Sequence, residues 1–158
     1  MDIGAKEILL VLLGFVLAHL PKWFDRKRNL KAHWCAIRAE MELCKEIAEG
    51  MRTEPRQTPL YRLPVTAFDT AFPILLAEAT VTEAESQTLS RFSGHVHDIN
   101  RGLDNAAEMY KASESGKLEE EFNRNLLKAK HLVEGYGSIY HAAKGIVDAK
   151  ISRRGWWY

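Results

Sequence analysis

Apolar residues recur at helical spacing in three long segments of the chain. In each segment they follow one another at alternating steps of four and three residues, which places them on one face of an α-helix. The first stripe is Leu30, Trp34, Ile37, Met41, Cys44, Ala48 and Met51; the second is Leu89, Phe92, Val96, Ile99, Leu103, Ala106 and Tyr110; the third is Phe122, Leu126, Ala129, Val133, Tyr136, Tyr140, Ala143 and Val147. The pattern predicts three long helices.

The connections between these stripes carry turn and capping residues. Pro55, Pro59 and Pro64 indicate a crossover loop, followed by a shorter apolar stretch at 65–79 in which Pro73 either kinks one helix or begins a second. The run Thr82-Glu83-Ala84-Glu85 predicts a capping box at the start of the second long helix. A turn containing Ser113, Ser115 and Gly116 separates the last two stripes.

These elements predict an all-α protein, with an up-down bundle of four helices. A heptad stripe is also typical of a parallel coiled-coil dimer, so a homo-oligomer stays open, although three stripes with short connections can bury one another within one chain. Gly135, Gly137 and Gly145 each weaken the last helix by roughly 1 kcal/mol relative to Ala, which indicates a close helix approach or a bend near Gly135.

The first residues of the chain have a different pattern. Residues 8–20 are apolar apart from His19. As a helix this run covers about 20 Å, against about 30 Å of bilayer hydrocarbon, whereas a helix from Ile3 to Phe24 covers the full thickness if Lys6 and Lys22 extend to the interface. A signal peptide and a peripheral apolar helix compete for the same residues. We expect a retained transmembrane anchor at 1–24.

Basic residues after the apolar run outnumber the single Lys6 before it, which orients such an anchor with its N-terminus outside and the C-terminal domain cytoplasmic. The expected division is an anchor at 1–24, a helical bundle at 25–151 and a basic-aromatic tail at 152–158. The expected partner of the basic and aromatic residues is the anionic inner leaflet. The membrane-interface residues are Lys22, Trp23, Arg26, Lys27, Arg28, Arg153, Arg154, Trp156, Trp157 and Tyr158.

The position of the C-terminal tail at 152–158 and that of the last hairpin are predicted from the up-down topology. The fourth helix of an up-down bundle returns toward the membrane, which would bring the tail beside Lys22, although Trp156 and Trp157 could instead pack on the bundle end. Three carboxylates oppose an anionic surface at the same corner, namely Glu78, Glu83 and Glu85. The hairpin at 112–121 would then project outward as a surface for a protein partner.

Net charge and histidine spacing argue against nucleic-acid binding and against a metal site. A net charge of +1 over 158 residues gives no indication of a nucleic-acid binder. His95 and His97 lie two positions apart, so on a helix they point about 200° from each other and do not clamp one metal ion. His131 and His95 each have an acid three residues later, but Glu-x-x-His pairs of di-metal bundles are missing. We expect no metal and no cofactor.

One short motif offers an enzymatic alternative. In Arg91-Phe92-Ser93-Gly94-His95-Val96-His97 an Arg precedes a His by six residues. This resembles the Arg-x4-6-His signature of HEPN-type ribonucleases, which are all-helical. The resemblance implies that Arg91 would stabilise phosphate charge and His97 would act in acid-base chemistry at a dimer cleft.

The sequence therefore leads to two hypotheses. The first is a single-pass membrane-anchored helical bundle that acts as a protein-interaction or scaffold module without catalysis. The second is a membrane-tethered HEPN-like ribonuclease that uses Arg91 and His97.

Overall fold

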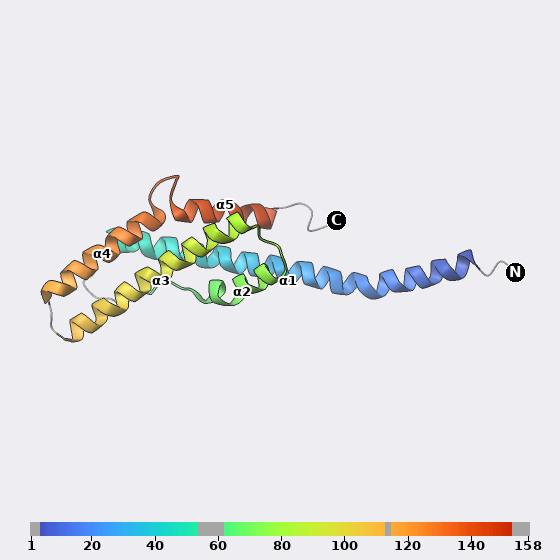
Figure 1. Ribbon diagram of the computed structural model, residues 1–158, viewed down its shortest axis with the longest axis horizontal. Coiled ribbons are helices and arrows are strands. Elements are labelled where there is room, and N and C mark those ends of the chain that lie inside the picture. Colours follow the sequence, from blue (N-terminus) through green and yellow to red (C-terminus); the bar gives the residue numbers. More distant parts are fainter. Residues whose placement is uncertain (1–3, 54–61, 113–114, 153–158) are drawn as a thin grey trace.

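The computed structural model describes residues 4–53, 62–112 and 115–152. Within them every regular element is a helix: α1 (Ala5–Thr53), α2 (Thr66–Ala77), α3 (Glu83–Lys111), α4 (Ser115–Val133) and α5 (Ile139–Ser152). α1 packs against α2, α4 and α5, while α3 packs against α4 and α5 (Figure 1). The prediction of an all-α helical bundle is confirmed, with five helices in the described residues where four were expected.

The core is built around the apolar stripes of α1 and α3, against which the other helices pack. On α1, Trp34, Ile37, Met41, Cys44 and Ala48 are buried, and Leu30 and Met51 pack against them partly exposed. On α3, six members of the second stripe are buried, and Tyr110, close to the end of the helix, is 59% exposed. Alternating steps of four and three therefore predicted the buried faces of both helices correctly.

The third predicted helix is broken into two. α4 ends at Val133, Gly135 has φ +82°, and α5 begins at Ile139. A positive φ is accessible to glycine without steric cost, and it ends the helix here. Tyr136, which the stripe placed in the core, is 98% exposed in the connection. The bend expected near Gly135 is thus a full interruption.

The predicted register of α4 is correct at Ala129 and Val133, which are buried, but not in the first half of the helix. Glu121 and Asn125 are buried at 5% and 2% exposure, whereas Phe122 and Leu126 are only partly buried. The amide group of Asn125 lies against Gly102 of α3, where a Cβ atom would stand 2.0 Å from Asn125 Oδ1. The close approach of α3 and α4 at this glycine places Asn125 inside.

α2 is held at its N-terminus by residues of other helices. Its N-cap residue, Val65, makes no side-chain capping bond. The carboxylate of Glu40 on α1 accepts hydrogen bonds from Ala67 N (2.6 Å) and Phe68 N (3.0 Å) instead. Ahead of α2, the Asn100 side chain exchanges two 2.8 Å hydrogen bonds with the Leu63 backbone. Pro73 lies inside α2, so the apolar stretch is one helix.

The start of α3 agrees with the sequence. Thr82 Oγ1 accepts from Glu85 N at 3.3 Å, and Glu85 Oε2 accepts from Thr82 N at 2.8 Å, so the predicted capping box is confirmed. The same carboxylate binds Nζ of the buried Lys150 at 2.7 Å, and Lys150 also donates to Thr80 O. These contacts tie the end of α5 to the start of α3.

The prediction of a single-pass membrane protein, with its N-terminus outside and its C-terminal domain cytoplasmic, is wrong. In the described part of the chain, no helix has a stretch that is both apolar enough and long enough for a membrane span. The apolar run at 8–20 covers about 20 Å of the roughly 30 Å required, and charged residues flank it at Glu7 and Lys22.

Candidate functional site

The first part of α1 carries the largest exposed apolar surface in the described residues. We call residues 8–20 the apolar segment. Figure 1 shows it projecting from the bundle as a lone helix. Its exposed side chains lie on all sides of the helix, with Val11 at 72% and Leu10 at 66%, and include Ile8, Leu12, Leu13, Phe15, Val16, Leu17 and Leu20.

His19 is the one ionisable residue within the apolar segment. Its ring nitrogen Nδ1 lies 2.9 Å from the Phe15 carbonyl oxygen, and its ring stacks on that of Phe15 with the centroids 4.1 Å apart. Both contacts lie within one helical turn, so they satisfy the imidazole locally. A histidine arranged in this way has no relay partner among the described residues of the segment.

The turn that follows the apolar segment is amphipathic. Pro21 lies inside α1, so the helix lacks one backbone N–H there. Trp23 is 41% exposed, packs edge-to-face on Phe24, and holds the Lys27 ammonium 3.5 Å above its ring. Indole and ammonium groups of this kind favour the boundary between an apolar phase and water.

The basic residues of this turn are partly paired with acids. Arg26 forms an ion pair with Glu78 at the end of α2, and Arg28 lies 3.6 Å from Asp25. Lys22, Trp23, Arg26, Lys27 and Arg28, which the sequence assigned to an interface, all lie between the apolar segment and the bundle. We call these five residues the junction. The other five predicted interface residues (Arg153, Arg154, Trp156, Trp157 and Tyr158) lie outside the described residues.

The acidic corner expected near this end is largely neutralised. Glu78 has Arg26 as its partner, and Glu85 has Lys150. Burial alone would raise the pKa of Glu85, but the hydrogen bonds from Lys150 and Thr82 outweigh burial and lower that pKa. Two of the three carboxylates that opposed an anionic surface are therefore committed to basic groups. The sequence did not show this, because the partners lie 52 and 65 residues away.

The two residues of the nuclease alternative lie on different sides of α3. Six positions along a helix correspond to a rotation of about 240° and a rise of about 9 Å. Arg91 and His97 are both exposed, and His97 Nε2 lies 3.3 Å from Asp69 Oδ1 on α2. Within the described residues of one chain they do not converge on a common site. The nuclease interpretation stays a prediction.

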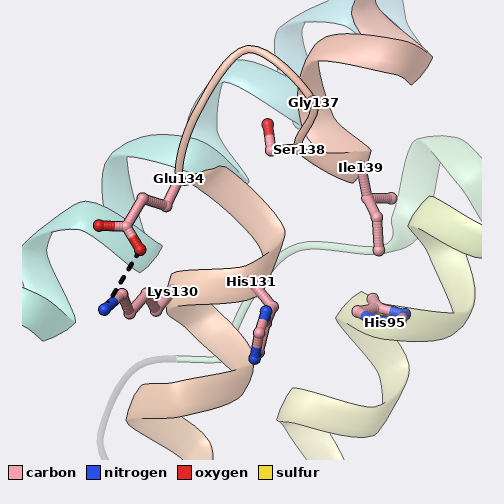
Figure 2. A pocket seen from close by; sticks show the side chains of 7 residues that line it. All are labelled: His95, Lys130, His131, Glu134, Gly137, Ser138 and Ile139. Carbon is pink, nitrogen blue, oxygen red and sulfur yellow. Dashed lines mark ion pairs between the residues drawn. The ribbon is translucent and has the colours of Figure 1, made fainter.

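An open pocket of about 350 Å³ lies beneath the connection from α4 to α5. Lys130 on α4 forms an ion pair with Glu134, directly after the helix, at 3.4 Å. Figure 2 shows this pair on one side and His131 on the other, pointing toward the α3 helix that carries His95. No cluster of three or more potential metal ligands exists in the described residues. The polar residues that line the pocket are His95, Lys130, His131, Glu134 and Ser138.

Comparison with family models, curated proteins and solved structures found no match to this chain.

Proposed function

We propose that this chain is a non-catalytic module that attaches a helical bundle to a lipid surface and presents the bundle to a protein partner. The observation that carries the proposal is the apolar segment, whose side chains are exposed on all sides and which ends at the junction. The proposal requires contact with lipid hydrocarbon and does not require passage through a bilayer.

The size of this surface supports a role in binding. The nine exposed side chains of the apolar segment present on the order of 900 Å² of apolar area, and the largest patch of a typical monomer is about 300–600 Å². At about 25 cal/mol per Å², removing this area from water provides on the order of 20 kcal/mol. A surface of this size requires an apolar partner.

Lipid fits the segment better than a second copy of the chain. A dimer covers one stripe of each helix, whereas the exposed side chains here surround the helix. Lipid hydrocarbon covers every side of a segment that enters it end-on. The junction supports the same choice, because Trp23 and Lys27 suit the headgroup boundary and each basic residue near anionic lipid contributes about 1 kcal/mol.

The remaining part of the proposal concerns the bundle. Figure 1 shows the hairpin of α3 and α4 at the end of the molecule that lies away from the apolar segment. Tyr110, at the end of α3 that enters this hairpin, is 59% exposed. A module attached through α1 would hold this hairpin away from the lipid, where a protein partner can reach it.

Flotation with vesicles tests the lipid contact. The full chain should float with vesicles of mixed neutral and anionic lipid, and the double substitution Leu12→Asp/Phe15→Asp should leave it at the bottom of the gradient. Leu43→Asp is the matched control, because Leu43 is a 46% exposed apolar residue of the same helix within the bundle. Wild-type chain that stays in solution as oligomers in the presence of vesicles would show that copies of the chain cover the segment, and would refute the proposal.

A further inference from the structure

The last turn of α2 carries a second exposed apolar surface. We call residues 73–79 the α2 tip. Ile74 is 43% and Leu76 41% exposed, on opposite sides of the buried Leu75, and the other exposed residues of the tip are Pro73, Ala77 and Ala79. The first turns of α2, in contrast, expose Thr66, Asp69 and Thr70. The exposed polar residues of this short helix thus lie toward its start and the exposed apolar ones toward its end.

The structure places the α2 tip beside the point where the apolar segment leaves the bundle. Glu78, the C-cap residue of α2, forms its ion pair with Arg26, which lies six residues beyond the last residue of the apolar segment. Figure 1 shows the end of α2 next to the part of α1 that continues into the projecting helix. The two apolar surfaces are therefore adjacent and lie at the same end of the molecule.

Two of the three carboxylates near the α2 tip are paired with basic groups, and the third, Glu83, is exposed. Glu78 within the tip is paired with Arg26, and Glu85 beyond it is paired with Lys150 at 2.7 Å. Lys150 Nζ also donates to Thr80 O directly after the tip, at 2.7 Å. Each of these two carboxylates would approach lipid headgroups together with its own basic partner, which reduces the repulsion.

We propose that the α2 tip is a second lipid-contacting element, which enters the headgroup boundary of the same lipid surface as the apolar segment. This inference rests on the proposed function. Contact at two adjacent points restrains the tilt of the bundle on the surface, since the apolar segment alone would leave the bundle free to tilt. The surface that the tip meets is lipid, because the ion pair of Glu78 with Arg26 holds the tip beside the junction, at the level where the apolar segment would enter lipid.

A fluorescent label at Leu76 tests this inference in the full chain. Cys35 is exposed and is replaced by Ser, while burial and the nearby Glu40 raise the pKa of Cys44 to about 12, so Cys44 resists labelling. An environment-sensitive label is attached to Leu76→Cys, to Leu12→Cys as the positive control and to Tyr110→Cys as the negative control. Vesicles of mixed neutral and anionic lipid should shift the emission of the first two to the blue and leave the third unchanged.

A substitution provides the second measurement. Ile74→Gln/Leu76→Gln should weaken vesicle partitioning at least about tenfold, because two half-exposed aliphatic side chains no longer enter the lipid boundary. The matched control, Leu43→Gln/Leu127→Gln, removes side chains of 46% and 59% exposure elsewhere and should leave partitioning unchanged. Because all four residues are exposed, unfolding temperatures should agree.

The two proposals fail in different ways. If the wild-type chain and the Leu12 label show no vesicle binding, the proposed function is refuted. If the chain binds, the Leu12 label shifts and the Leu76 label keeps its emission in water, the lipid contact of the α2 tip is refuted and the proposed function stands.

Discussion

Replacement of Glu40 by Ala should destabilise the bundle by about 3 kcal/mol. Glu40 lies on α1, is 8% exposed, and its carboxylate accepts hydrogen bonds from Ala67 N and Phe68 N in the first turn of α2. A hydrogen bond to a charged group contributes about 1.5–3 kcal/mol, and a negative charge at a helix N-terminus up to about 2 kcal/mol. The cost of burying the carboxylate offsets part of this sum.

Thermal unfolding followed by circular dichroism in mild detergent measures the effect. A loss of about 3 kcal/mol should lower Tm by roughly 10 °C in a chain of this size. Glu40→Gln keeps one acceptor oxygen and should fall between wild type and Ala. The control is Glu46→Ala, because Glu46 lies on the same helix and is exposed, so its removal should change stability by less than about 0.5 kcal/mol.

Amide exchange locates the effect. In the Ala variant the backbone N–H groups of Ala67 and Phe68 lose their acceptor, so they should exchange with solvent faster than those at the end of α2. If the Glu40 and Glu46 variants unfold at the same temperature, or if exchange at residues 67 and 68 is unchanged, Glu40 does not cap α2.

The other predictions concern the α3–α4 contact and acid. Gly102→Ala should lower the stability of the bundle by about 1–3 kcal/mol, although Ala favours helices, because its Cβ would lie 2.0 Å from Asn125 Oδ1. In a double-mutant cycle of Tm values, Asn125→Ala should recover most of this loss. Simple additivity of the two substitutions would contradict the contact. Hydrogen bonds from Lys144 and Tyr140 lower the pKa of Glu42. The stability that these bonds provide is present above the ordinary pKa of 4.5 and is lost as the pH falls below that value. Between about pH 5 and pH 3, the Tm of Glu42→Gln should therefore decrease less than the Tm of wild type, and parallel pH profiles would contradict this.

The sequence predicted the structure well wherever local pattern decides it. The buried faces of α1 and α3 follow directly from the spacing of apolar residues, and the capping box needs only Thr82 and Glu85. The abrupt change in charge and aromatic residues after residue 20 marks the junction in the same local way, and the contact of the junction with lipid stays a prediction. These signals lie within one helix and its ends.

Long-range contacts explain what the sequence did not predict. The pattern continued through Gly135 because Tyr136 and Tyr140 keep the helical spacing, but the chain turns there and leaves Tyr136 exposed. Asn125 is inside because Gly102, 23 positions earlier, lets α3 approach. The α2 tip carried a usable signal, the charge-free run at 70–77, but its place beside the junction depends on the Arg26–Glu78 pair.

The connections of α1 indicate how the apolar segment is coupled to the bundle. α1 continues from the segment into the core without interruption and packs against α2, α4 and α5. Polar contacts reinforce two of these interfaces: Glu40 caps α2, and Tyr140 Oη on α5 donates to Glu42 at 2.6 Å. A force on the segment is therefore shared by three helices. In the attachment proposed above, these contacts would join the segment directly to three helices of the bundle, and the α2 tip would add a second point of support on the same surface.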